Sequence, residues 1–214
     1  MKISVVCSDS SHPVYSHLQC WCDAQSAAHS VELVTNIAEL SGGDLLFLIS
    51  CTEIVPAAVR SRYQVALVVH ASDLPYGRGW SPLVWQILEG RNEIAVTLLE
   101  AADPVDSGPL WQKRWLYFDG TELSDELNAA LFAAELELMD YALKNMGRVQ
   151  VTPQNEVAAT WYSRRGPEHS RLDPKRSLAE QFDLLRVTDA ERYPAYFEYR
   201  GASYEVLIRR RKKS

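Results

Sequence analysis

The sequence predicts an α/β fold in which a mostly parallel sheet is flanked by helices. Short apolar runs typical of buried strands alternate with segments of helical periodicity along the N-terminal part of the chain. Residues 45–49, LLFLI, are a continuous apolar run, as expected of a central parallel strand that is covered on both faces. The length of 214 residues is enough for one sizeable core and a small appendage.

The spacing of apolar residues indicates where the elements of this first part lie. The predicted strands are residues 2–7, 31–34, 45–49, 65–69, 94–99 and 111–118, the last as an edge strand. The predicted helical segments are residues 13–28, 37–40, 50–55, 82–88 and 122–146. Pro13 suits the first position of a helix, and Ser50, Cys51 and Thr52 can cap the short segment that carries Ile54 and Val55. The last helix is the clearest, because apolar residues recur every three or four positions before Gly147.

From residue 149 onward, turn residues, charges and short apolar runs replace the alternation of strands and helices. Residues 154–173 are polar and predicted to be extended, and residues 177–186 are predicted to form a short helix. Residues 193–208 are predicted to form a hairpin with Gly201 at its turn. We therefore expect a first domain over residues 1–148 and an extension over residues 149–214 that packs on it.

Composition and charge exclude several classes of function. The formal net charge of −6 argues against binding of nucleic acid, because contacts to phosphates require a basic face. The exception is the basic tail 209–214, which we expect to be solvated and frayed. No apolar run approaches the ~20 residues that span a bilayer, and the N-terminus does not resemble a secretory signal. We expect a cytoplasmic protein without membrane contact.

The four cysteines are expected to be reduced thiols in that compartment. Cys20 and Cys22 are separated by one residue, which is not the spacing of the common zinc knuckles, and no second pair matches them. We therefore predict no metal site.

The best candidate for a functional site follows the strand at residues 65–69. That strand ends in His70, and a loop rich in glycine and proline comes next. In α/β folds the carboxyl ends of strands open into a ligand crevice, although a solvent-exposed histidine in an ordinary turn has the same local pattern. Asp106 lies on a later polar loop. An imidazole oriented by a carboxylate is suited to general acid or base work near neutral pH.

Several motifs in this region resemble the folate-dependent formyltransferases, the family of the methionyl-tRNA, glycinamide-ribonucleotide and nucleotide-sugar formyltransferases. They are HASDLP at residues 70–75, RGWSP at 78–82, WQILEG at 85–90 and VTLLEAADPVDSGPLW at 96–111. On the family pattern His70 matches the catalytic histidine, Ser72 the loop serine, and Asp106 the catalytic aspartate. The resemblance extends over roughly residues 1–110 in the order of elements, and it implies a Rossmann-like sheet of the formyltransferase type.

One position departs from the family pattern. Where the family has an asparagine two residues before the histidine, this chain has Val68. In relatives that amide helps to stabilise the oxyanion that develops on the formyl group, and loss of one such donor costs on the order of 100- to 1000-fold in rate. Either another donor, such as a backbone N–H or the His70 imidazolium, replaces it, or the enzyme is slow or inactive.

The resemblance implies transfer of a formyl group from 10-formyltetrahydrofolate to a primary amine, with His70 moving a proton and Asp106 orienting its ring. The C-terminal part is similar to the matching segment of the nucleotide-sugar and tRNA enzymes, with Gln154, Arg186, Pro194 and Gly201 at comparable places. This favours a nucleotide-linked amino sugar as acceptor and a homodimer formed through the hairpin. Two alternatives stay open, namely another amine as acceptor, or a folate-binding relative that has lost catalysis.

The same resemblance indicates two sets of contact residues. The residues expected along the folate are Ser50, Cys51, Ile54, Ala101, Asp103 and Val105. The residues expected along the acceptor are Ser72, Tyr76, Arg78, Trp80, Ser81 and Trp111. In the acceptor set, Arg78 could bind a phosphate or be solvated. Tyr76 and Trp111 could stack on a ring of the acceptor or serve only in packing.

Overall fold

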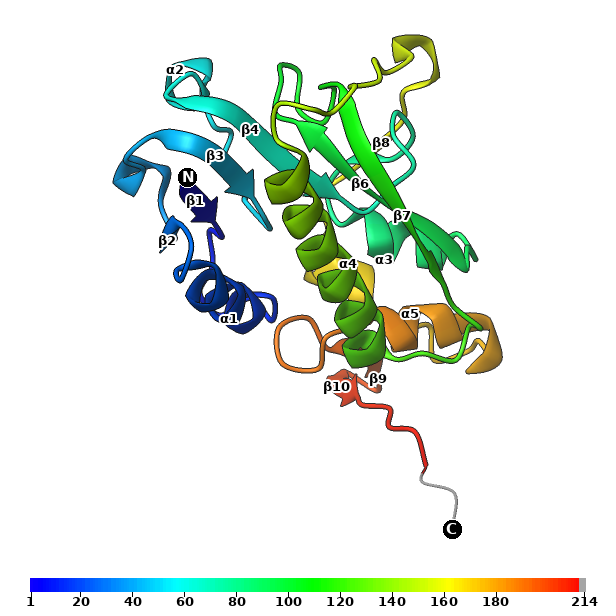
Figure 1. The fold of residues 1–214 in the computed structure, drawn as a ribbon. Helices are drawn as coiled ribbons and strands as arrows, with labels where there is room; N and C mark the ends of the chain where they lie inside the picture. Colours follow the sequence, from blue (N-terminus) through cyan, green and yellow to red (C-terminus); the bar gives the residue numbers. More distant parts are fainter. Residues whose placement is uncertain (212–214) are drawn as a thin grey trace.

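The computed structural model describes residues 1–211 and places one six-stranded sheet at the centre of the molecule, in the order β2-β1-β3-β4-β6-β7 (Figure 1). Its strands are β1 (Lys2–Val6), β2 (Ser30–Val34), β3 (Gly43–Leu48), β4 (Tyr63–His70), β6 (Glu93–Glu100) and β7 (Leu110–Tyr117). The six strands predicted from the sequence are therefore all present, with ends that differ by one or two residues.

Four neighbouring strands, β2, β1, β3 and β4, are parallel, and β6 and β7 add to them in antiparallel pairs. The prediction of a mostly parallel sheet is confirmed. Because β1, β3 and β4 point the same way, the residues that follow them meet at one edge, which we call the carboxyl edge. His70 is the last residue of β4 and lies at this edge.

Helices cover both faces of the sheet. Helices α1 (Tyr15–Gln25) and α4 (Ser124–Asn145) lie on one face, where they enclose the largest apolar cluster together with strand residues such as Leu67 and Val69 (Figure 1). The opposite face packs Ala66 and Val68 against residues near the short 3-10 turn η1 (Ile37–Glu39) and the short helix α2 (Ala57–Arg60). Consecutive β4 residues thus belong to different layers, as the pleat of a strand requires.

The structure corrects two predicted helical segments, the first of which begins later than expected and the second of which is absent. The first helix begins at Tyr15, and Pro13 lies in a turn before it. Residues 50–55 are not helical, and α2 begins at Ala57 after Pro56. A proline disfavours helical backbone at the residue before it, which keeps Val55 and the residues leading to it out of the helix. Helix α3 (Pro82–Leu88) has the predicted bounds.

The chain after α4 returns to the loop that follows His70 before it reaches the hairpin. Thr152 bridges Leu110, and the short strand β8 (Trp161–Tyr162) pairs with β5 (Arg78–Gly79). The 3-10 turns are η2 (Glu156–Ala158), η3 (Pro167–Ser170) and η4 (Ala179–Gln181). The helix predicted at residues 177–186 is divided between η4 and α5 (Phe182–Val187). The hairpin is confirmed as β9 (Ala195–Tyr199) and β10 (Ala202–Val206), with Gly201 in its turn.

The prediction that the basic tail is solvated and frayed is wrong for Arg210, which contacts the rest of the molecule. The guanidinium of Arg210 donates hydrogen bonds to Thr121 and pairs with Glu126 at a distance of 2.9 Å, near the start of α4. The rest of that prediction, for residues 212–214, lies outside the described residues. Within residues 1–211, no helix is both long and apolar enough to cross a membrane.

Candidate active site

His70 is buried at the carboxyl edge and makes one strong hydrogen bond. Its side chain is nearly enclosed, and its Nε2 donates to the backbone carbonyl of Gly77 at 2.8 Å. A nitrogen that donates to a carbonyl carries the ring proton, so Nδ1 of the neutral ring has a free lone pair. Nδ1 is therefore the atom of His70 that can accept a proton.

Asp106 lies beside that atom. The loop between β6 and β7 brings its Oδ2 to 3.6 Å from Nδ1 of His70, and the same oxygen accepts the backbone N–H of Gly79 at 2.9 Å. Asp106 has left-handed backbone, with φ of 57°, which turns its buried side chain toward the histidine. A carboxylate in this position stabilises the imidazolium formed when Nδ1 takes a proton. The structure thus brings the two predicted catalytic residues together.

Gln154 from the C-terminal part holds the Asp106 loop in place. Its Nε2 donates to the carbonyls of Asp106 and Gly108, at 2.9 and 2.7 Å. Its Oε1 accepts a hydrogen bond from Arg78 at 2.7 Å, and Arg78 also forms a two-pronged pair with Glu156. The loop that carries Asp106 is therefore fastened to the segment that follows α4.

Arg78 differs from the prediction that it borders the acceptor. Its side chain is 1% exposed, and both terminal nitrogens are engaged with Gln154 and Glu156. A guanidinium in this position is not free to bind a phosphate, and it joins two parts of the chain instead. Its partners lie more than seventy residues away in sequence, so the local pattern could not reveal this role.

Gly79 supports the geometry of the pair, and its replacement by alanine is expected to disrupt it. Its φ is +94°, and a Cβ would come within 2.5 Å of the Tyr162 carbonyl oxygen. The shift needed to relieve this clash moves the N–H that holds Asp106, and a displacement near 1 Å can cost on the order of 100-fold in rate. Gly90 has a similar φ of +79° with no atom near its Cβ position, so Gly90→Ala is the matched control. Equal rates of turnover for the two variants would contradict this prediction.

The residues predicted to contact folate lie in two segments that the fold brings together. Cys51, from the first segment, and Ala101, from the second, both pack against the cluster that contains Val68. Ile54 and Val105 have side chains that are 73% and 43% exposed. Ser50 has left-handed backbone, with φ of 50°. Asp103 differs from the others because it pairs with Arg60, the last residue of α2.

The residues predicted to line the acceptor site differ in burial and in their contacts. Tyr76 and Trp80 are exposed, and the guanidinium of Arg164 lies 4.8 Å from the centre of the Trp80 ring. Ser81 is exposed and has left-handed backbone at the start of α3. Ser72 is buried two residues after His70, and its hydroxyl has no hydrogen-bond partner among the described residues.

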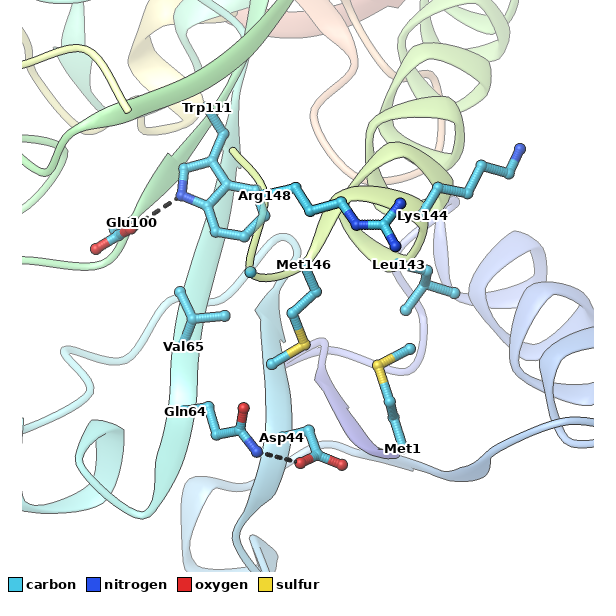
Figure 2. A pocket seen from close by; sticks show the side chains of 11 residues that line it. Met1, Asp44, Gln64, Val65, Glu100, Trp111, Leu143, Lys144, Met146 and Arg148 are labelled. Carbon is cyan, nitrogen blue, oxygen red and sulfur yellow. Dashed lines mark hydrogen bonds between the residues drawn. The ribbon is translucent and has the colours of Figure 1, made fainter. Parts of the chain in front are cut away.

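Trp111 lies away from His70 and Asp106, contrary to the prediction that it borders the acceptor. Its indole N–H donates to Glu100 at 2.9 Å. The ring lines a pocket of about 600 Å³ together with Val65, Met146 and Met1 (Figure 2). Met1 precedes β1, so the pocket lies toward the amino ends of the parallel strands, away from His70. The alternation of apolar and polar residues in β7 does not show at which edge of the sheet this strand begins.

Sequence reasoning did not identify two polar residues at the carboxyl edge, His12 and Glu135. His12 lies just before the first predicted helical segment, and Glu135 occupies a position of α4 at which an apolar residue would be expected. A carboxylate in the buried stripe of an otherwise regular helix is the signal that could have found it. Among residues 1–211, no three His, Cys, Asp or Glu side chains are grouped so that they could hold a metal ion.

A family model described as formyl transferase matches residues 1–143. The chain belongs to the formyl transferase family. The resemblance inferred from the sequence motifs is confirmed, and the protein is an N-formyltransferase of a family that uses folate.

Solved structures share the fold of this formyltransferase at low sequence identity. Methionyl-tRNA formyltransferase from Clostridium thermocellum has a TM-score of 0.82 and 22% identity, over 99% of this chain and 94% of that one. HypX from Aquifex aeolicus, in complex with tetrahydrofolic acid, has a TM-score of 0.79 and 22% identity, over 97% of this chain but 37% of its own. A sugar N-formyltransferase from a Shewanella species has a TM-score of 0.74 and 15% identity, over 100% and 99%.

Proposed function

We propose that this formyltransferase moves a formyl group from 10-formyltetrahydrofolate to the primary amine of an amino sugar that is linked to a nucleotide. The observation that carries the proposal is the buried pair of His70 and Asp106, held 3.6 Å apart at the carboxyl edge of the sheet. A base that is poised beside a fixed carboxylate is what an attacking amine needs, because the amine must lose a proton as it forms the new bond.

The two folate segments fit a flat, largely apolar ring. Ile54 and Val105 expose apolar surface, and a ring lying between their segments would remove that surface from water. Cys51 and Ala101 would form the base of this site, where both contact the cluster of Val68. When bound, 10-formyltetrahydrofolate supplies the formyl carbon, and its bond to the departing nitrogen breaks as the amide bond forms.

His70 and Asp106 have distinct roles in the proposed reaction. Nδ1 of His70 takes the proton that the amine loses and returns it to the departing nitrogen, so no proton is gained or lost overall. Asp106 stabilises the imidazolium between these two steps. The bond from Nε2 to Gly77 keeps the ring oriented throughout.

The position of Val68 favours a second candidate, a relative with weak or lost catalysis. The Val68 side chain packs into an apolar cluster and offers no hydrogen-bond donor to a developing oxyanion. Loss of one such donor corresponds to a reduction of about 100- to 1000-fold in rate. A folate-binding protein with little transferase activity is therefore the alternative to the proposed enzyme.

The acceptor class is supported by the surface next to the site. Tyr76 and Trp80 expose aromatic rings, and Arg164 places an exposed cation over Trp80. Rings that can stack on a base, together with a cation for phosphate, suit a nucleotide. The net charge of −6 disfavours a polynucleotide.

The exposed Tyr199 and Tyr204 of the hairpin suit the predicted homodimer contact, which stays a prediction.

An assay of formyl transfer separates these candidates. Purified protein is supplied with 10-formyltetrahydrofolate and a panel of uridine- and thymidine-diphosphate-linked 4-amino sugars, with an amino acid and an aminoglycoside as alternative acceptors. We expect an N-formylated product from at least one nucleotide-linked sugar. Transfer only to an alternative acceptor would reject the acceptor class. Folate binding without transfer to any amine would favour the impaired relative.

A further inference from the structure

The pocket that contains Trp111 has no part in the proposed reaction. It has a volume of about 600 Å³, and we call it the amino-edge pocket (Figure 2). Sites that bind small molecules commonly have volumes of about 300 to 1,000 Å³. Val65 lines this pocket and His70 ends the same strand, so the two residues are about 16 Å apart along β4. The pocket is therefore large enough for a small molecule and separate from the catalytic pair.

The base of the amino-edge pocket is apolar and rests on the core. Val65, Trp111, Leu143 and Met146 line the pocket, and each packs, partly buried, against the largest apolar cluster. The indole N–H of Trp111 is already bound to Glu100 at 2.9 Å, which fixes the plane of the ring. A tryptophan ring that is held in this way offers its apolar face to a ligand that fills the pocket.

Methionine side chains gather at this pocket. The chain has three methionines, of which Met1 and Met146 line the pocket and Met139 is buried in the core. Met1 precedes β1 and is 40% exposed, whereas Met146 follows α4 and is half-buried. Thioether side chains adapt to the shape of a ligand and make favourable contacts with aromatic rings. Together with Trp111, they suit a flat ring.

The charged groups of the pocket are divided between two sides. Lys144 and Arg148 come from the end of α4 and the residues after it, and both are exposed. Within residues 1–211, neither of them forms an ion pair. The carboxylates lie on the strands and already accept hydrogen bonds, Asp44 from the backbone N–H of Lys2 at 2.7 Å and Glu100 from the indole. Positive charge is therefore free only on the α4 side.

We propose that the amino-edge pocket binds a small molecule in which a planar aromatic ring carries an anionic group. The ring lies against Trp111 and between the two methionines, and the anionic group pairs with Arg148 and Lys144. A guanidinium is suited to this role because its paired N–H donors match a carboxylate or a phosphate. The carboxylates on the strand side repel the anion and so fix the orientation of the ligand. This inference is independent of the acceptor and of the formyl-transfer reaction.

Nuclear magnetic resonance of protein labelled with ¹³C at the methionine methyl groups tests the assignment without measuring turnover. Met1 and Met146 report on the pocket, and Met139 is an internal control in the core. The probes are adenosine 5′-monophosphate and indole-3-acetate, each compared with its uncharged partner, adenosine or indole-3-acetamide. We expect at least one anionic probe to shift the signals of Met1 and Met146 in a saturable way and to leave that of Met139 in place. Which of the two anions binds distinguishes a phosphate ligand from a carboxylate ligand.

The uncharged partner of the probe that binds should bind about tenfold more weakly, because it lacks the hydrogen bonds between an anion and the guanidinium. Arg148→Gln should weaken the anionic probe by a similar factor and leave the uncharged partner unchanged. Trp111→Leu should weaken both, because it removes the face on which the ring lies. Arg114→Gln is the control, since Arg114 lies on the same strand as Trp111, outside the pocket, and pairs with Glu137 at 3.4 Å.

Several results would overturn the assignment. They are the absence of a shift at Met1 and Met146 with both anionic probes, equal affinity for the anionic and uncharged members of a pair, and wild-type affinity for the anionic probe in Arg148→Gln. Equal shifts of all three methionine signals would also reject it, because they would indicate an effect on the whole fold. If Trp111→Leu by itself displaces the Met139 signal, this variant has disturbed the core, and Arg148→Gln, on the exposed rim, decides the matter.

Discussion

His70→Ala is expected to lower kcat/KM for formyl transfer by about 100- to 10,000-fold, the usual contribution of a positioned general base. The variant removes Nδ1, the only atom of this side chain that has a free lone pair beside Asp106. The loss should appear mainly in kcat, because the proton moves during the chemical step. It is measured as the initial rate of N-formyl product formation with saturating 10-formyltetrahydrofolate and the acceptor identified by the panel.

Asp106→Asn tests the partner of His70 with little change in shape. The amide oxygen can still accept the N–H of Gly79, but the negative charge beside Nδ1 is lost. Without that charge the imidazolium formed during proton transfer is less well stabilised, so we expect at least about a tenfold lower kcat. His17→Ala, on the exposed surface of α1, is the control for both variants. Unchanged turnover in His70→Ala and Asp106→Asn would rule out this pair as the catalytic machinery.

Glu135 is expected to make the stability of the protein decrease as the pH rises from about 4.5 to about 8. Burial raises the pKa of this carboxyl from 4.5 to about 8. Across that interval the unfolded chain releases the proton and the folded chain retains it, so the folded state binds more protons. The free energy of unfolding then falls by about 1.4 kcal/mol for each pH unit. Below pH 4.5 both states are protonated and the penalty is absent.

Glu135→Gln removes this titration and should flatten the pH dependence over the same interval. The measurement is urea unfolding of wild type and variant at several pH values, compared as differences so that other titrating groups cancel. Glu137→Gln is the control, because Glu137 lies two residues further along α4 with its side chain 64% exposed. Parallel profiles for wild type and Glu135→Gln would show that Glu135 is ionised in the folded protein.

The sequence alone was sufficient to predict the strands, the long helix, the hairpin and the family. Each of these leaves a local signal, since apolar spacing reports which side chains are buried and the motifs around His70 and Asp106 are contiguous. Catalytic residues that end strands are also accessible to such reasoning, because the carboxyl ends of parallel strands meet at one edge.

The tertiary structure decided what depends on contacts between distant parts of the chain. Periodicity does not carry direction, so the antiparallel pairing of β6 and β7 could not be inferred. Arg78 has its partners on a segment that returns after α4, and Trp111 faces the opposite edge. The ring of His12 lies 6.1 Å from that of Phe132, more than a hundred residues away, and Glu135 is buried only when α4 packs on the sheet. A residue is recognised as unsatisfied only after the fold has removed water from around it.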